Sequence, residues 1–369
     1  MKKIAVLALL VCLLLGFYPP STQAASTNGN FCDEFKGVKK IWWNGVELKT
    51  GQIGRLTVIK DTPLYKLTGD KKLPSRTLKS GEFYRIYAFK PGMLSVGGGY
   101  YVDRDANVKY ETPSKAKLLA VQCVNLPGWV SYGGKWYYLN KDGQMAVNTT
   151  VDGRKVGADG AWVQVQYVAL GDSLAAGMTP SGQDRPEDLG YPDYIKENLA
   201  KTYQMVNYDN FGVSGYTTND VIADMSKVNV QKEIKEATYL TIDIGANDLL
   251  PVIQVDPTQA PAAIATAAAK LNTILSKIDE LNPKVKVYVM GYYNPFPYLT
   301  EQKAQLDQLL QAFNGQIQAQ ALLHGDTFVP TTQVINVANF KDYLPSPFNI
   351  HLSPLGYQVV AGEFLKVMN

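Results

Sequence analysis

The stretch YVALGDSLAAG, at residues 167–177, places Ser173 in a short loop directly after an apolar run. A serine hydroxyl becomes a useful nucleophile when a base takes its proton, and histidine is the side chain suited to that near neutral pH. The chain has two histidines. His324 ends an expected helix, where a cation near the last carbonyls is ordinary, whereas His351 lies in a polar loop and is the better candidate base. The alternative is that Ser173 only caps a helix.

From residue 166 onward, apolar strands alternate with helices, and this pattern predicts a parallel sheet that is covered on both faces. The expected strands are YVALG, MVNYDNFG, YLTIDIG, KVKVYVMG and TFVP, and the expected helices are 192–202, 219–225, 261–281, 301–323 and 354–367. Functional groups of such sheets lie in loops beyond the carboxyl ends of the strands. Ser173, the 212–215 loop and Asn247 follow the first three strands, so we expect them at one edge.

Four motifs occur in order along this region: GDSLAAG with Ser173, NFGVSGYTT with Gly215, IGANDLL with Asn247 and NIHLSPLGY with His351. Residues 166–369 therefore resemble the GDSL, or SGNH, hydrolases, which are serine esterases with a flavodoxin-like three-layer α/β fold. The resemblance implies that Ser173 and His351 are catalytic and that Ser173, Gly215 and Asn247 form the oxyanion hole. Any one of these residues alone would be a turn or a cap, but the four together favour a hydrolase.

Physical reasons support these roles. Acyl transfer needs hydrogen-bond donors aimed at the developing oxyanion. Glycine at position 215 lets a backbone N–H approach the substrate closely, because it has no Cβ. The Asn247 side chain can supply a second donor, and the Ser173 N–H a third.

The group that orients His351 departs from the pattern of the family. An aspartate usually stands three residues before the histidine, sometimes two, whereas this chain has Phe348 and Asn349 there. The candidates are the Phe348 carbonyl, the Asn349 amide oxygen and Asp342, and we rank the Phe348 carbonyl first because its position has the right reach. A neutral orienter stabilises the imidazolium less well, so we expect a slower enzyme rather than an inactive one.

Two β-rich segments precede the hydrolase region. Residues 26–125 read as short strands divided by Gly, Pro and Asp, and they resemble the small Src-homology-like barrels of bacterial envelope proteins. Residues 128–163 contain GKWYYL followed by DG and MA, then a weaker echo, and they resemble the wall-binding repeat of choline- and glucan-binding proteins, which hold a quaternary amine by cation–π attraction. A plain β-hairpin spacer is the alternative. Cys32 and Cys123 bracket the first segment, and an oxidising exterior would favour their pairing over free thiols.

Residues 1–24 read as a signal peptide, with Lys2 and Lys3 before an apolar run that is too short to span a bilayer comfortably. We therefore expect a secreted protein of a Gram-positive bacterium, and the wall-type repeat suggests association with the cell wall. Residues 31–125 hold 17 Lys/Arg against 9 Asp/Glu, whereas residues 126–369 carry a net charge of −7. This asymmetry suggests modules with different partners, and the basic module would suit an anionic wall polymer unless its charges are merely solvated.

The sequence thus predicts a serine hydrolase that cleaves carboxylic esters through an acyl-enzyme on Ser173. Short-chain or acetyl esters are the first expectation, on envelope polysaccharide or lipid, and longer acyl chains, as in a lysophospholipase, or thioesters are the alternative. A different class is a non-catalytic wall-binding protein with a decayed hydrolase domain, which the missing acid would favour. We expect no cofactor, metal or nucleic-acid partner, because the sequence has no CxxC pair and no GxxxxGK[ST] loop.

Overall fold

The computed structural model describes residues 31–69, 71–180, 189–336 and 338–368. The chain divides into two compact units, unit 1 (31–147 with 158–161) and unit 2 (148–157 with 162–368), so the division falls inside the 128–163 segment. The expected signal peptide and Cys12 lie outside the described residues. Within the described ranges, every helix is too short or too polar to cross a membrane.

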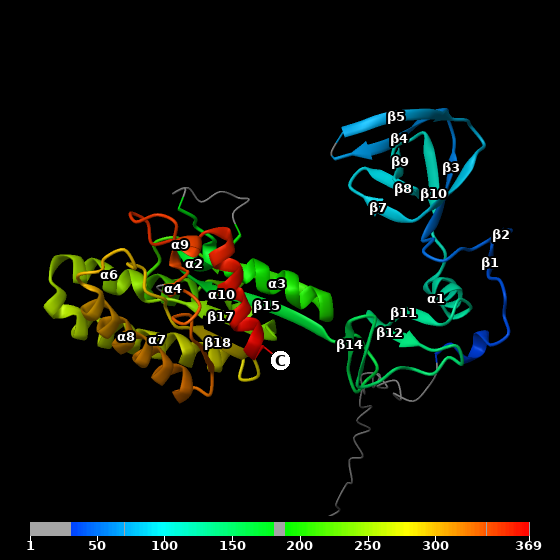
Figure 1. Ribbon diagram of the computed structural model, residues 1–369. Helices are drawn as coiled ribbons and strands as arrows, with labels where there is room; N and C mark the ends of the chain where they lie inside the picture. Colours follow the sequence, from blue (N-terminus) through cyan, green and yellow to red (C-terminus); the bar gives the residue numbers. More distant parts are fainter. Residues whose placement is uncertain (1–30, 70, 181–188, 337, 369) are drawn as a thin grey trace, which may run out of the picture. The chain divides into compact units, whose positions relative to one another are not determined.

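Unit 1 consists mostly of short antiparallel strands (Figure 1). Its elements are η1 (Asp33–Phe35), β1 (Trp42–Trp43), β2 (Val46–Glu47), β3 (Gly54–Val58), β4 (Thr62–Thr68), β5 (Lys71–Leu78), β6 (Phe83–Ile86), β7 (Ala88–Lys90), β8 (Met93–Gly97), β9 (Tyr100–Asp103), β10 (Val108–Glu111), α1 (Lys115–Cys123), β11 (Gly128–Tyr132) and β12 (Lys135–Leu139). One sheet has the order β10-β3-β6 and another the order β5-β4-β9-β8-β7.

The two larger sheets of unit 1 share a small apolar core. Side chains of a strand alternate between its faces, and β3 buries Leu56 and Val58 in this way. They join Leu78, Ile86 and Leu94, among others, from neighbouring strands. The predicted small β-rich module is therefore present.

The expectation that residues 26–125 are entirely β is wrong at one place, because residues 115–123 form helix α1. Ser114 caps this helix by accepting a hydrogen bond from the Lys117 N–H at 3.3 Å. The helix ends at Cys123, which forms a disulfide with Cys32 at a Cα–Cα distance of 5.3 Å. The cross-link lies in a second core cluster with the buried residues of the β11–β12 hairpin, in which 128–132 pair with 135–139.

Unit 2 alternates strands and helices (Figure 1). Its elements are β13 (Thr149–Val151), β14 (Arg154–Val156), β15 (Gln164–Gly171), α2 (Ser173–Ala176), α3 (Tyr191–Thr202), β16 (Gln204–Gly212), α4 (Thr218–Asp224), α5 (Val228–Glu236), β17 (Tyr239–Asp243), α6 (Ala246–Val255), η2 (Pro257–Gln259), α7 (Ala260–Leu281), β18 (Lys286–Met290), α8 (Lys303–Leu323), β19 (Thr327–Val329), α9 (Phe340–Tyr343) and α10 (Pro354–Val367).

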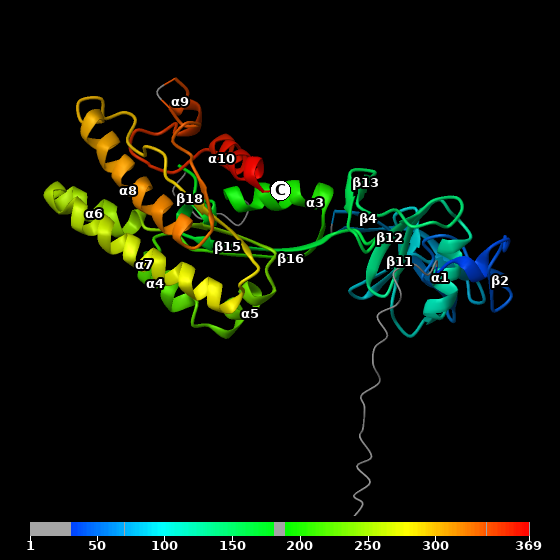
Figure 2. The ribbon, with the colours of Figure 1, turned by 90° about the horizontal axis from the view of Figure 1, so that it is seen from below.

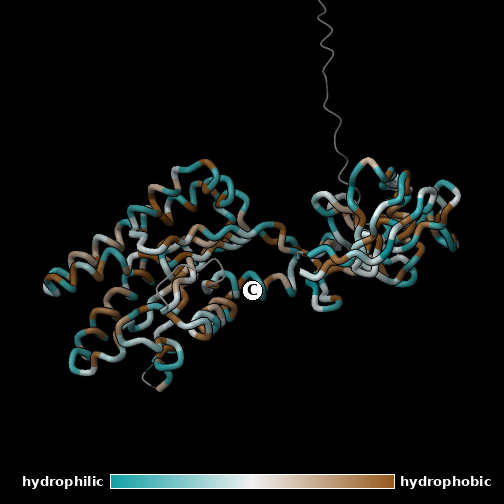
Figure 3. The backbone as a smooth tube through the Cα atoms, turned by 90° about the horizontal axis from the view of Figure 1, so that it is seen from above, coloured by the Kyte–Doolittle hydropathy of each residue, from teal (hydrophilic) through white to brown (hydrophobic). Residues whose placement is uncertain are grey.

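The central sheet of unit 2 has five parallel strands in the order β16-β15-β17-β18-β19. The parallel sheet is the one that the strand–helix alternation predicts, and its order is the flavodoxin-like order that the resemblance to the GDSL hydrolases implies. Helices α3 and α10 pack against each other on one face, and α4, α5 and α7 cover the other (Figure 2). Teal and brown alternate along the helices in Figure 3, as expected for helices that bury one side. This arrangement brings the carboxyl ends of β15, β16 and β17 together at one edge.

Apolar patterning explains most of these elements, and the helices that escaped prediction are the one-turn helices α2 and α9 and the longer α5 and α6. In α7, Ile264, Leu271, Ile274 and Ile278 are buried at helical spacing. Helix α5 is short and buries only Val230 and Ile234, and α6 carries a proline in its interior, which argues against a helix.

Candidate active site

Ser173 lies at the turn where β15 ends and α2 begins. The residue before it, Asp172, is the N-cap of α2, and its side chain accepts a hydrogen bond from the Leu174 N–H at 3.0 Å. Asp172 is therefore the N-cap of α2, and Ser173 is not. Its hydroxyl instead faces a pocket, although the residue is only 8% exposed.

Small residues make this sharp turn possible. A Cβ at Gly171 would lie 2.3 Å from Asp243 Oδ1, and a Cβ at Gly212 would lie 2.5 Å from the Ala175 Cβ. Both distances are shorter than real carbon contacts, so a larger residue at either position would displace α2. The two glycines thus fix where Ser173 stands relative to the sheet.

His351 reaches Ser173 from the loop between α9 and α10. Its Nε2 lies 2.8 Å from Ser173 Oγ, across 178 residues of sequence. The Tyr293 hydroxyl donates to the Ile350 carbonyl at 2.9 Å, and Ser353 caps α10 through the Gly356 N–H. Both ends of this loop are therefore attached to neighbouring structure.

Asn349 sets the orientation of the His351 ring. Its Oδ1 accepts the His351 backbone N–H at 2.9 Å and lies 2.7 Å from His351 Nδ1. Because the backbone amide needs an acceptor, the atom at this position is the oxygen, and an oxygen of an amide can only accept. Nδ1 therefore carries the hydrogen, and the lone pair of Nε2 faces the serine hydroxyl.

This arrangement differs from our ranking, which put the Phe348 carbonyl first. The physical reason is local: one Asn349 oxygen serves both the backbone and the ring of His351, two residues on, in an Asx-type turn. Asp342, the third candidate, belongs to α9, and its backbone carbonyl accepts the Ser353 hydroxyl at 2.8 Å.

The loops after β16 and β17 are joined through Asn247. Its Nδ2 donates to the Tyr216 carbonyl at 2.8 Å, in the residue after Gly215. Gly215 has a φ of 84°, and no protein atom lies within 4 Å of a Cβ built there. Its left-handed backbone conformation, and not crowding by the protein, is therefore what favours glycine.

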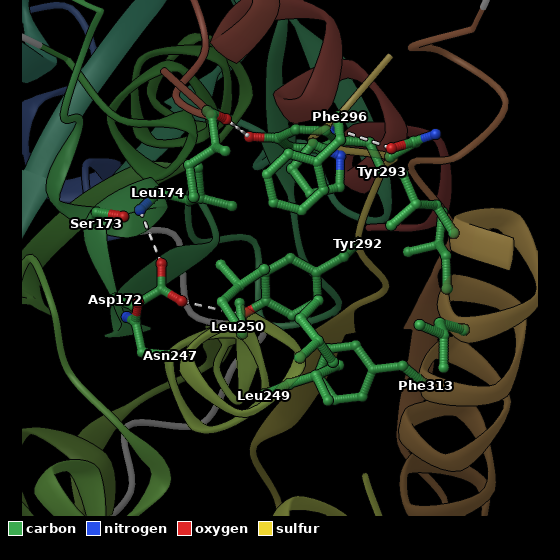
Figure 4. Close-up of a pocket in the computed structure, with 18 of the residues that line it drawn as sticks. Asp172, Ser173, Leu174, Asn247, Leu249, Leu250, Tyr292, Tyr293, Phe296 and Phe313 are labelled. Carbon is green, nitrogen blue, oxygen red and sulfur yellow. Dashed lines mark hydrogen bonds between the residues drawn. The ribbon is translucent and has the colours of Figure 1, made fainter. Parts of the chain in front are cut away.

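A pocket of about 750 Å³, counting the space at its mouth that opens to solvent, extends from Ser173, Asn247 and His351. Figure 4 shows Ser173 at one end and the rings of Tyr292, Phe296 and Phe313 along it. The rest of its wall is mainly aliphatic and comes from α6 and α8, namely Leu249, Leu250, Ile253, Leu306, Leu309 and Leu310. The sequence analysis did not identify these residues, because they come together only when the two helices pack.

Two buried carboxyl groups behind Ser173 also escaped the sequence analysis. Asp172 is 2% exposed, and Asp243, at the end of β17, is fully buried. Burial, and then the neighbouring Asp172, raise the pKa of Asp243 well above its ordinary value, and burial likewise raises the pKa of Asp172. The available signal was a charged residue inside the apolar run YLTIDIG.

His324, the other histidine, is engaged elsewhere. It is the C-cap residue of α8, and its ring nitrogens lie 2.6 Å from Asp279 Oδ2 and 2.9 Å from Asn272 Oδ1 of α7. These contacts fit the structural role that its place at a helix end suggested.

Comparisons with known proteins agree with this architecture. A model of the GDSL-like lipase/acylhydrolase family matches residues 169–359, and a model of the choline-binding repeat matches residues 127–162. The chain is similar to the Bacillus subtilis protein YpmR, at 24% identity over 53% of this chain and 78% of that protein. It is also similar to the spore germination lipase LipC of Bacillus licheniformis, at 24% identity over 53% of this chain and 93% of LipC.

Among solved structures, the lipase Lip_vut3 from a goat rumen metagenome matches with a TM-score of 0.47 and 23% identity, over 56% of this chain and 97% of that one. The family match spans more than half of the chain and includes Ser173, Gly215, Asn247 and His351. This chain belongs to the GDSL-like lipase/acylhydrolase family.

Proposed function

We propose that this protein is a secreted serine hydrolase that cleaves carboxylic esters through an acyl-enzyme on Ser173. The observation that carries the proposal is the 2.8 Å contact between Ser173 Oγ and His351 Nε2, with the ring tautomer set by Asn349. A hydroxyl that faces the lone pair of an oriented imidazole is the arrangement that nucleophilic catalysis requires.

In the first half of the reaction, Ser173 Oγ attacks the ester carbonyl carbon and its proton passes to His351 Nε2. The carbonyl oxygen becomes an oxyanion that the Ser173 and Gly215 N–H groups and Asn247 Nδ2 stabilise. When the C–O bond to the alcohol breaks, the departing oxygen takes the proton from Nε2. Water then repeats these steps on the acyl-enzyme, which releases the acid and restores the serine.

Asn349 orients His351 without a negative charge. A carboxylate at that position would also stabilise the imidazolium that forms in each half-reaction. An amide oxygen supplies the tautomer and the hydrogen bond only, so we expect turnover that is slower than with an aspartate.

The pocket favours the longer-chain alternative over acetyl esters. Most of its wall is aliphatic or aromatic, and it continues from Ser173 between α6 and α8. An acetyl group would leave this apolar surface unfilled, whereas each further methylene buried there gains about 0.8 kcal/mol. The name of the similar protein LipC, a lipase, is in keeping with this choice.

We place the enzyme outside the cell, in association with the wall. The N-terminal signal-like segment supports export, and the match to the choline-binding repeat supports a wall ligand for residues 127–162. An acyl group on envelope lipid or polysaccharide is then the accessible substrate.

The test is a series of aryl esters with acetyl, butanoyl, octanoyl and dodecanoyl groups, combined with labelling by a fluorescent organophosphonate. The wild type should be labelled and should prefer the octanoyl or dodecanoyl ester, and Ser173→Ala should lose both properties. Ser226→Ala, at an exposed serine of unit 2, is the matched control and should behave as the wild type. Absence of labelling and of hydrolysis in the wild type would favour the non-catalytic wall-binding alternative.

A further inference from the structure

The reaction proposed above assigns no role to two buried carboxyl groups, those of Asp172 and Asp243. Asp172 precedes Ser173, and Asp243 ends β17, where it pairs in register with Gly171 of β15. The Asp243 carboxyl occupies the space that a side chain at position 171 would need, 2.3 Å from that Cβ position. Both carboxyls therefore form the floor beneath the loop that carries Ser173.

Each carboxyl accepts two hydrogen bonds from groups of the protein. Asp172 accepts from the Leu174 N–H at 3.0 Å and from the Tyr292 hydroxyl at 3.0 Å. Asp243 accepts from the Tyr191 hydroxyl at 2.7 Å and from the Asp172 N–H at 3.3 Å. The dashed lines of Figure 4 mark the two contacts of the Asp172 carboxyl.

The side chains of Asp172 and Asp243 are both buried, the Asp172 N–H donates to Asp243, and each carboxyl acts on the pKa of the other. An ionised carboxyl can only accept, so two neighbouring carboxyls can bond to each other only when one of them carries a proton. Two adjacent negative charges in a buried region would in addition repel strongly. The other titratable side chains that act on the pair are neutral tyrosines, because burial raises the pKa of each well above its ordinary value: Tyr167, Tyr191, Tyr292 and Tyr293.

We propose that Asp172 and Asp243 hold one proton between them, carried by Asp243 and donated to the Asp172 carboxylate, and that this pair is a positioning device for Ser173. Each carboxyl accepts from one backbone N–H and one tyrosine hydroxyl, but the N–H contact of Asp172 is the shorter, at 3.0 Å against 3.3 Å, and it caps α2, so Asp172 is the better anion.

The pair fixes the peptide units on both sides of the nucleophile. Asp243 holds the Asp172 N–H, and Asp172 holds the Leu174 N–H, so Ser173 lies between two restrained amides. The kinetic consequence rests on the proposed function, whereas the shared proton does not.

Two substitutions at Asp243 distinguish a side chain that donates a hydrogen bond from one that only fills space. In Asp243→Asn, the amide NH₂ replaces the shared proton and the amide oxygen still accepts from Tyr191. Only the long 3.3 Å contact from the Asp172 N–H is lost, so kcat/KM for an aryl ester should stay within about threefold of the wild type. In Asp243→Leu the same partners lose their hydrogen bonds inside the protein, and kcat should fall by about tenfold or more with little change in KM.

Infrared difference spectra, wild type minus Asp243→Asn, give a readout that packing alone would not move. At neutral pH the difference should show one positive C=O stretch of a protonated carboxylic acid, because the contribution of Asp326 is present in both proteins and cancels. A spectrum without that band, or an Asp243→Asn enzyme as impaired as Asp243→Leu, would overturn the proposal. If Asp243→Leu does not fold, the spectrum and the asparagine variant still decide.

The proposed function can fail separately. If Ser173→Ala keeps full hydrolysis, the role of Ser173 is wrong, but the infrared band would still establish the shared proton.

Discussion

The two units of this chain solve the problem of stability in different ways. Unit 1 divides its buried apolar residues among three small clusters, and a disulfide between Cys32 and Cys123 closes a 91-residue separation across it. Unit 2 has one large continuous core around its parallel sheet and no disulfide among its described residues. Small cores supply little net stability, and covalent cross-links are a common supplement.

The difference extends to buried carboxyl groups, which among the described residues are found in unit 2 and not in unit 1. Unit 2 buries Asp172, Asp243 and Thr241 beside its sheet, and these groups are hydrogen-bonded. A large core offsets the cost of burying such groups more readily than a small one, because it removes more apolar surface from water. The reacting side chains thus lie in the unit with the larger core, and if the comparison holds the two units should respond separately to substitution.

The largest expected effect is on chemistry. His351→Ala removes the base, and kcat for an aryl ester should fall by about 10⁴-fold or more. The unfolding of unit 1 should not change, because the substitution lies in unit 2. Tryptophan fluorescence measures it, since four of the five tryptophans lie in unit 1. His324→Ala is the matched control and should retain kcat; a large loss there would mean that the wrong histidine had been chosen.

Removal of the disulfide tests the other unit. In the double variant Cys32→Ser with Cys123→Ser, the free energy of unfolding of unit 1 should fall by about 2–5 kcal/mol, because the unfolded chain is no longer cross-linked. Tryptophan fluorescence in urea measures this. The helical circular-dichroism signal, which comes mainly from unit 2, and ester hydrolysis should stay as in the wild type; a joint loss would show that the units are interdependent.

Asn349→Ala sharpens the account of the site. Without the amide oxygen the His351 ring loses its preferred tautomer, and kcat should fall by about 10- to 100-fold while thermal stability changes little. Asp342→Ala should have a small effect. The opposite pattern, with Asp342→Ala inactive and Asn349→Ala normal, would mean that the acidic residue reaches the ring during turnover.

Narrowing the pocket should lower kcat/KM for long acyl esters selectively, by about tenfold. Leu309→Trp fills the space between α8 and the reacting groups, so kcat/KM for the dodecanoyl ester should drop about tenfold and that for the acetyl ester should change less than about twofold. Leu322→Trp, at a 63% exposed position of the same helix, is the control. Equal losses on both esters would place the acyl chain elsewhere.

The smallest expected effect is on how the free energy of unfolding depends on pH. Burial and the neighbouring Asp279 raise the pKa of Asp326 to about 7, and its Oδ2 is buried without a hydrogen-bond partner among the described residues. The unfolded value is about 3.9, so stability is lost as the pH rises from about 4 through 7, where the folded carboxyl must ionise.

Asp326→Asn should therefore be more stable than the wild type by about 1–2 kcal/mol at pH 8, after allowance for partial exposure, and equal to it near pH 4. Urea unfolding followed by circular dichroism measures this, with Glu280→Gln as an exposed control on α7. A gain at pH 4 instead would contradict the assigned cause.

Local patterns in the sequence predicted the sheet of unit 2 because β15, β17 and β18 are nearly continuous apolar runs that are buried on both faces. The rule for parallel strands also predicted that Ser173, the 212–215 loop and Asn247 meet at one edge, whereas His351 was chosen by elimination and by its motif. Helix α1 was missed, since its nine residues have only a weak amphipathic pattern inside a β-rich segment.

Contacts between distant segments were beyond prediction. The pairing of Gly171 with Asp243 depends on the register of β15 against β17, which no local pattern specifies. The choice of Asn349 over Phe348 depends on a side-chain conformation within one turn. The pocket wall depends on how α6 and α8 face each other.

Helix α8 lines the pocket, yet each residue assigned to the chemistry comes from another segment: Ser173 from the end of β15, Gly215 from the loop after β16, Asn247 from α6 and His351 from the final loop. Substitutions on the inward face of this single helix could thus change which acyl group the proposed reaction accepts, with the reacting atoms left in place. Related proteins that prefer different acyl groups should therefore differ in sequence on this face of α8 before they differ at the reacting residues.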